Sequence, residues 1–323
     1  MKRLAAFLLL TLPALAAIDG TVINRTTGKP QSGVEVNLIK LAQGMEPAGS
    51  AKTGPDGKFH IEASAQDPYL LQAHHQGVAY NIQLPPGSAA TPIEVPVFDV
   101  TTKPLDAVDE HILLVETDGQ EVVVHEALIY KNAGTLTWAD PNRGTLRFYA
   151  PSAAGDQIKV RAVAPGGMPV ERAPKQAGEK DVWQVDYPVK PGGETRFDIS
   201  YKLPAANPLK FATRILHAAG PVRLLLPKGI KPEGAGIKEM GVEPSTQAMI
   251  YDVTTKALNL TLTGTGQVNS LQPTERSEDD GPTIEQIQPP GFDRNKYWIL
   301  GLMLSILAVS FIAQYARGAA GKR

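Results

Sequence analysis

The chain contains no cysteine in its 323 residues. This absence excludes disulfide bonds, thiol redox chemistry, cysteine-ligated metals and an acylated lipoprotein anchor. Any folded part outside the cytoplasm must therefore be held together by its hydrophobic core. The length is sufficient for two or three domains of ordinary size.

An excess of basic charge is also absent. The formal net charge is −1, and removal of Lys2 and Arg3 with an N-terminal leader would give −1 − 2 = −3. No large positive field is available to attract nucleic acid, so we expect no nucleic-acid partner.

Established catalytic and metal-binding motifs are missing as well. The sequence has no HExxH zinc motif, no GxSxG nucleophile elbow, no GxxxxGK phosphate loop and no EF-hand spacing. We therefore predict no catalytic residue, no cofactor and no metal site, and we expect a protein that is not an enzyme.

Charged residues are absent from one long run, Tyr297–Tyr315. A helix of this length rises about 28 Å, close to the thickness of the bilayer hydrocarbon, and tyrosine and tryptophan lie at its ends. We predict a transmembrane helix over 297–315 and a short cytoplasmic tail over 316–323. Gly301, Ser305 and Ala308 form a stripe of small residues that would let another helix approach closely.

The N-terminus matches this anchor. Lys2 and Arg3 precede a short apolar stretch, and Ala14-Leu15-Ala16 has the small-x-small pattern of a cleavage site. We interpret residues 1–16 as a signal peptide. The expected location is the bacterial inner membrane, crossed once, with the N-terminal domains in the periplasm and the C-terminus in the cytoplasm.

Between these ends the pattern is that of β-strands. Short runs rich in β-branched and aromatic residues are separated by turns containing many of the 30 glycines and 27 prolines. We predict an all-β fold of tandem antiparallel β-sandwiches. The clearest runs are 34–39, 58–63, 121–130, 145–150, 158–163, 196–203 and 257–264.

The first of these sandwiches is expected over residues 18–102. Val34, Val36 and Leu38 alternate with polar residues, and Gly57 closes a Pro-Asp-Gly turn that favours positive φ. The order of the segments GTV, GKP, GVEV and DGKF resembles the carboxypeptidase regulatory-like domain. That resemblance implies a transthyretin-like β-sandwich with a structural or adhesive role.

Residues 105–266 are predicted to form a second sandwich region, with a split near residue 203 left open. The segments 97–104 and 250–257 share Asp-Val-Thr-Thr-Lys, which we attribute to chance rather than to duplication. Residues 267–296 lose all periodicity and are rich in polar residues, which predicts a flexible linker.

Histidine pairs are the most tempting candidates for metal ligation. His74-His75 and His125-Glu126 are neighbours on strands, so their side chains must point to opposite faces. For His125-Glu126 we expect one side chain inward with a hydrogen-bond partner and the other in solvent. His60 and Glu62 share a face, but no third ligand can be identified.

Trp138 lies near a strand end, where its ring could stack on a sugar. Trp183 alternates with valines and is equally suited to the core. The leading hypothesis is a non-enzymatic, membrane-anchored protein that binds or scaffolds another envelope protein. The alternatives are a tether for carbohydrate or peptidoglycan, and a hydrolase with an unrecognised site.

Overall fold

The computed structural model describes residues 17–41, 44–64, 67–88, 92–105 and 108–268. In these ranges β-strands are the main secondary structure, as the sequence pattern predicts. No helix that is long and apolar enough to cross a bilayer occurs within them. The predicted signal peptide, the membrane span with Gly301, Ser305 and Ala308, and the cytoplasmic tail lie outside the described residues.

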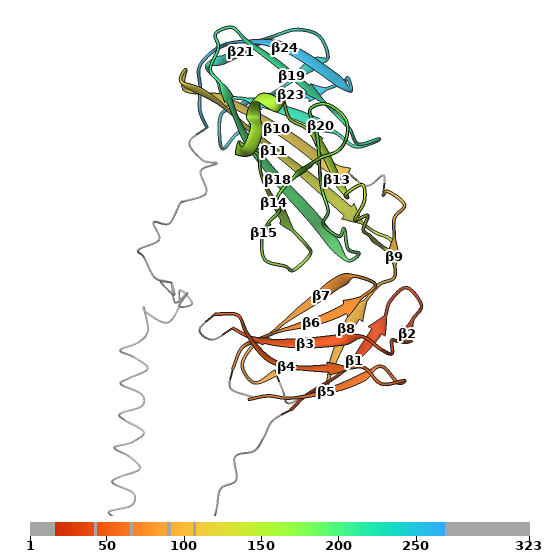
Figure 1. Ribbon diagram of the computed structural model, residues 1–323. Coiled ribbons are helices and arrows are strands. Elements are labelled where there is room, and N and C mark those ends of the chain that lie inside the picture. The colour runs from red at the N-terminus through yellow and green to blue at the C-terminus, as the bar shows by residue number, and fades with distance from the viewer. Residues whose placement is uncertain (1–16, 42–43, 65–66, 89–91, 106–107, 269–323) are drawn as a thin grey trace, which may run out of the picture. The chain divides into compact units, whose positions relative to one another are not determined.

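The N-terminal part forms a β-sandwich-like unit of two sheets (Figure 1). In one sheet β1 pairs with β2, β5 and β8, and the other has the order β4-β3-β6-β7. The strands are β1 (Ala17–Asn24), β2 (Lys29–Pro30), β3 (Glu35–Lys40), β4 (Glu46–Lys52), β5 (Lys58–Glu62), β6 (Tyr69–His75), β7 (Val78–Leu84) and β8 (Ile93–Val97).

The core of this unit lies between its two sheets. Val36 and Leu38 from β3 are buried, which confirms the inward face predicted from their alternation, and Phe59 and Ile61 from β5 are buried in the same core. A buried aliphatic or aromatic side chain of this size contributes about 1.5–3 kcal/mol through the hydrophobic effect.

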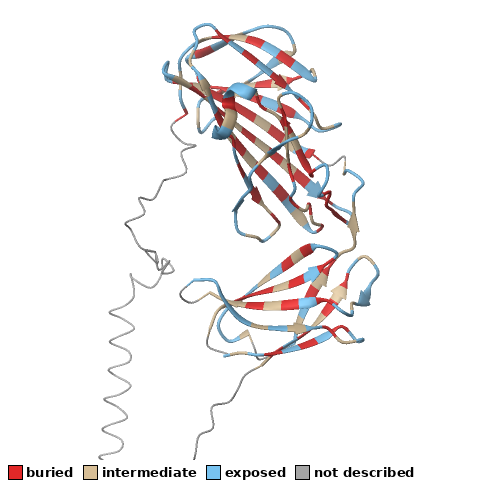
Figure 2. Cartoon of the chain, viewed as in Figure 1, coloured by how far each residue is buried: buried red, intermediate tan, exposed pale blue. Residues whose placement is uncertain are grey.

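The second part has an eight-stranded sheet with the order β15-β14-β18-β11-β10-β20-β23-β22. Figure 2 shows buried and exposed residues alternating along its strands, as expected when one face is covered. The strands are β10 (Val108–Thr117), β11 (Glu121–Asn132), β14 (Lys159–Val163), β15 (Val170–Glu171), β18 (Gly193–Pro204), β20 (Val222–Leu226), β22 (Ile237–Val242) and β23 (Met249–Val253).

Two three-stranded sheets, ordered β13-β17-β16 and β19-β24-β21, contribute to the same core. Because β10 and β11 pair with strands from both sides of residue 203, the region 108–266 forms one sheet system with one core. The strands are β13 (Leu146–Tyr149), β16 (Lys175–Gln176), β17 (Val182–Val185), β19 (Leu209–Arg214), β21 (Ile230–Glu233) and β24 (Ala257–Gly264), and the 3-10 segment η2 (Ser152–Gln157) follows β13.

Strand direction differs in part from the antiparallel prediction. The pairs β1/β8 and β10/β20 are parallel, as is the short pair β9 (Val100–Thr101) with β12 (Thr137–Trp138). Alternation of polar and apolar residues is the same for both directions. Only the tertiary path of the chain between distant strands decides between them.

The turn at Gly57 provides a test of the local geometry. Gly57 has φ +74°, and an added Cβ would lie 2.8 Å from the carbonyl oxygen of Val22 and 2.8 Å from the Cβ of Pro30. Gly28 has φ +72° and no atom within 4 Å of such a Cβ, so it is a matched control. We expect Gly57→Ala to destabilise the protein by about 1–3 kcal/mol more than Gly28→Ala.

Urea or guanidinium denaturation of the two variants measures this difference. Both substitutions introduce the same strain of a left-handed backbone, so only the steric contact distinguishes them. Equal losses of stability would show that the chain relaxes around Gly57 without penalty.

Candidate functional site

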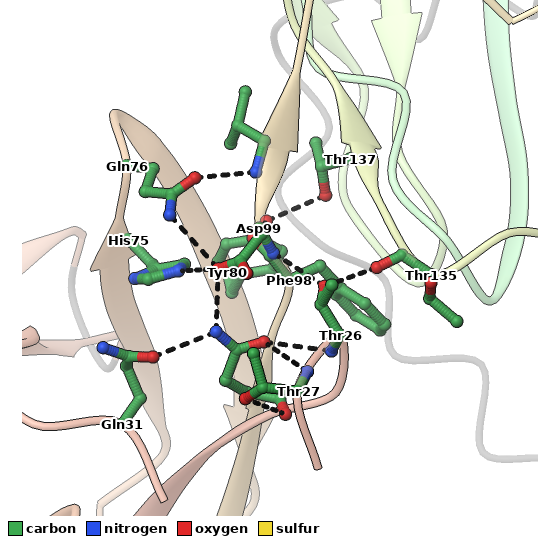
Figure 3. A network of polar contacts seen from close by, with 12 residues as sticks. Thr26, Thr27, Gln31, His75, Gln76, Tyr80, Phe98, Asp99, Thr135 and Thr137 are labelled. Carbon is green, nitrogen blue, oxygen red and sulfur yellow. Dashed lines mark hydrogen bonds and ion pairs between the residues drawn. The ribbon is translucent and has the colours of Figure 1, made fainter. Parts of the chain in front are cut away.

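A network of polar groups surrounds Asp99, in the segment between β8 and β9 (Figure 3). Asp99 Oδ1 accepts hydrogen bonds from Asn24 Nδ2 at 2.7 Å, His75 Nε2 at 2.9 Å and Gln76 Nε2 at 3.1 Å. Asn24 and His75 are buried. A single carboxylate oxygen therefore organises three side chains from β1 and from the β6–β7 turn.

Local sequence explains how these side chains converge. Gln76 adopts φ 48° in the Gln76-Gly77 turn, which tightly connects β6 to β7. Its side-chain oxygen accepts a hydrogen bond from the backbone nitrogen of Val100 at 2.7 Å. At the end of β1, Asn24 Oδ1 accepts from the backbone nitrogen of Thr26 at 2.9 Å, as Asx turns do.

The network continues into the segment 135–139. Thr26 Oγ1 donates to the carbonyl oxygen of Thr135 and accepts from the backbone nitrogen of Asp99. The Tyr80 hydroxyl donates to the carbonyl oxygen of Phe98 at 2.8 Å and lies 2.8 Å from Thr137 Oγ1. These contacts accompany the parallel pairing of β9 with β12.

Lys190 adds a positive charge beside the same tyrosine. Its Nζ lies 5.0 Å from the centre of the Tyr80 ring and donates to the carbonyl oxygen of Ala79. Burial lowers the pKa of Lys190 to about 8 because desolvation disfavours the charged form. The ring face of Tyr80 offers partial compensation through a cation–π contact.

The negative charge of the network lies on Asp99. Hydrogen bonding from His75, followed by that from Asn24, lowers the pKa of Asp99 below its ordinary value, against the opposing effect of burial. The carboxylate therefore stays ionised at neutral pH and orients its donors. We interpret this network as a structural clamp between β1, β6, β7 and β9 rather than as a reaction centre.

A second cluster lies in the core of the C-terminal part. His111 on β10 and Glu126 on β11 are both buried, and His111 Nε2 lies 2.7 Å from Glu126 Oε1. His111 Nδ1 lies 2.9 Å from Nε2 of the half-buried His217. His217 Nδ1 donates to the carbonyl oxygen of Ala219 at 2.8 Å.

The strand histidines behave as alternation predicts. His75 is buried while His74 is exposed, and Glu126 is buried while His125 is partly exposed. The expectation that one member of His125-Glu126 points inward to a hydrogen-bond partner is confirmed. His60 is exposed and pairs with Asp19 at 2.8 Å.

The two tryptophans take different positions. Trp138 is only 6% exposed, and its ring centre lies 5.9 Å from that of Tyr130. Its assignment to ligand stacking stays a prediction, and a ligand would have to reach a ring that is almost covered. Trp183 is partly buried and donates from Nε1 to the carbonyl oxygen of Ala150 at 3.0 Å.

The sequence interpretation missed Asp99, His111 and His217. Each is joined to partners far away in the chain, His217 to His111 across 106 residues, and no short motif encodes such a contact. Asp99 had one available signal, its place in the shared Asp-Val-Thr-Thr-Lys segment. The described ranges contain no group of three or more His, Cys, Asp or Glu side chains suited to hold a metal ion.

Asp99→Ala tests the clamp. The substitution leaves the three donors on Asn24, His75 and Gln76 without their acceptor, and we expect a loss of about 1–3 kcal/mol of stability at pH 7. Because the pKa of Asp99 is lowered in the folded state, its stabilisation is present above its ordinary pKa of 3.8 and is lost as pH falls through the folded value. The difference between wild type and Asp99→Asn should therefore shrink in acid.

Denaturant unfolding at pH 7 and pH 3 measures both effects. Asp156→Ala, at an exposed position in η2, is the control and should change stability by less than about 0.5 kcal/mol. An Asp99→Ala variant as stable as this control would rule out the clamp.

No protein-family model and no curated protein matches the chain. Among solved structures, the M1 zinc metallopeptidase from Deinococcus radiodurans is similar over 49% of this chain, with 12% identity and a TM-score of 0.24. A mutant of the same peptidase gives 49% coverage, 12% identity and a TM-score of 0.25. The chain spans 42% of the length of those peptidase chains.

Proposed function

We propose that this chain is a non-enzymatic, single-pass membrane-anchored protein of the bacterial envelope, whose β-sandwiches bind or scaffold another envelope protein. The first unit, 18–102, is in this proposal a transthyretin-like module of the carboxypeptidase regulatory-like type. The charge-free run at 297–315 and the predicted leader at 1–16 are the sequence features that support the anchor and the location in this proposal.

The observation that carries the binding role is the outer edge of the eight-stranded sheet. β22 is the terminal strand and pairs with β23 alone among the described strands. Met240 is 63% exposed and Val242 is 48% exposed, although both are apolar. An open strand edge with exposed apolar side chains favours pairing with an extended segment of another protein.

The details of β22 restrict where a partner would pair. The register with β23 shifts between Glu239 and Gly241, so Met240 occupies a bulge. Bulges and charges such as Lys238 protect strand edges from non-specific pairing. These features limit how much of the edge can pair, so we assign docking to the short segment from Met240 to Val242, which carries the exposed apolar side chains. We assign as its occupant an extended strand of an envelope protein with apolar residues at alternate positions.

Binding of a protein strand at β22 is better supported than binding of a glycan. The glycan alternative depends on Trp138, whose ring is almost fully buried. The edge of β22 presents main-chain groups and apolar side chains, which suit a peptide strand better than a sugar.

Site-specific photo-cross-linking in native membranes tests the proposal. A photoreactive residue at Met240 of the full-length chain should give a discrete adduct with another envelope protein. The same residue at Met168, which is 49% exposed near β15, is the control and should give no such adduct. Val242→Lys should lower the yield of the adduct at least about tenfold, because a charge disfavours edge pairing.

Recovery of the monomer alone would contradict the proposal. Equal labelling from positions 240 and 168, insensitive to Val242→Lys, would indicate non-specific contact and would also reject it.

A further inference from the structure

The segment Ile215–Pro221 between β19 and β20, called here the latch loop, is held firmly at both ends. The backbone nitrogen of Ile215 donates to the carbonyl oxygen of Lys256 at 2.8 Å, and that of His111 donates to the carbonyl oxygen of Pro221 at 3.2 Å. The middle of the loop is mostly exposed. Side-chain contacts of His217 and Lys256 add to these backbone hydrogen bonds.

One of these contacts is the hydrogen-bonded chain through His217. A carbonyl oxygen can only accept, so the 2.8 Å contact with Ala219 requires a proton on His217 Nδ1. In neutral His217, Nε2 is then an acceptor, and the proton of the 2.9 Å contact belongs to His111 Nδ1. The tautomers of both rings are thus fixed by their partners.

The contact between His111 and Glu126 fixes the number of protons that these three side chains hold. His111 Nε2 and Glu126 Oε1 are 2.7 Å apart and must share one proton, either on the imidazole or on the carboxyl group. The closed arrangement of His217, His111 and Glu126 therefore holds three protons. A fourth proton on His217 Nε2 would point at the N–H of His111 and break the contact.

We propose that the latch loop is an acid-released device, in which neutral His217 docks the loop on β10 and protonation of this ring frees the loop. In the open form His217 faces solvent and takes up a second proton near the ordinary imidazole pKa of about 6.5. His111 and Glu126 remain paired in the core and keep their shared proton. Opening therefore takes up one proton below about pH 6.5.

The charges around the latch loop also favour its release at low pH. The Lys256 ammonium donates to the carbonyl oxygens of His217 at 2.7 Å and Ala218 at 2.9 Å, so a positive charge already lies beside the loop. Tyr130 and Tyr201 face Glu126 from β11 and β18, and burial raises the pKa of both, so they stay neutral.

Arg214, which directly precedes the latch loop, pairs with Glu179. A second ion pair joins Arg223 on β20 to Glu110 on β10. Glu110 is adjacent to His111 along β10, so its side chain points to the opposite face of the sheet. The charges of Arg223 and Glu110 neutralise each other, and the pair lies away from the latch loop.

The pH range follows from the linkage between opening and proton uptake. Burial, and then the charges of His111 and Lys256, lower the pKa of His217 to about 4 in the closed form, while a hydrogen bond to Ala219 opposes this. The stabilising effect of the closed latch is present above the ordinary pKa and is lost as pH falls toward 4. The opening equilibrium should rise about tenfold per pH unit across this range, or about 300-fold in total.

Hydrogen–deuterium exchange of the full-length chain between pH 7.5 and 4.5, corrected for intrinsic exchange rates, tests this device. Protection of the amides of Ile215 and His111, whose hydrogen bonds hold the two ends of the latch loop, should be constant above about pH 6.5 and fall about tenfold per unit below it. His217→Gln, which cannot be protonated, should make protection independent of pH. Lys256→Met should raise opening at every pH but keep the pH dependence.

His60→Gln is the matched control, because His60 is an exposed histidine paired with Asp19 in the N-terminal unit. It should leave the exchange of the latch loop unchanged. Protection of the amides of Ile215 and His111 that stays flat in wild type, or a pH dependence that survives in His217→Gln, would overturn the proposal.

Discussion

The parallel pairing of β10 with β20 is the contact on which the C-terminal part depends. It aligns His111 with Val222 and Leu114 with Leu225, and so joins strands that are separated by about a hundred residues. Without it the sheet would divide between β10 and β20, and β22 and β23 would lose their support. The same pairing places the latch loop, which immediately precedes β20, over the end of β10.

The second constraint is the burial of polar groups in a core that has no disulfides to support it. Glu126 lies between Val124 and Leu128 on the inner face of β11, where an isolated carboxylate would be strongly disfavoured. Its partner His111 is contributed by the neighbouring strand. A buried pair of this kind adds little net stability compared with apolar residues, but it penalises any register that separates the two side chains. The polar pair therefore specifies the alignment of β10 with β11.

Much of the fold was predictable from local pattern. Alternation in 121–130 and 196–203 predicts β11 and β18, and the Pro-Asp-Gly turn predicts the positive φ of Gly57. Strand direction was not predictable, because polar and apolar alternation is identical for β10 beside β20 in either orientation. The polar clusters could not be predicted from the sequence, because alternation does not show which strands pair. Alternation shows that Glu126 points inward, but only the tertiary structure shows that His111 contacts it and that His217 contacts His111.

The two ends of the eight-stranded sheet are unequal. At one end β15 has only two residues, whereas at the other β22 has six, with its bulge at Met240. A sheet with two usable edges can grow copy upon copy into a filament, but this one offers a single long edge. Two copies meeting through that sheet would have to place β22 against β22 about a twofold axis, which leaves no further long edge. Edge-to-edge assembly through β22 would therefore stop at the dimer.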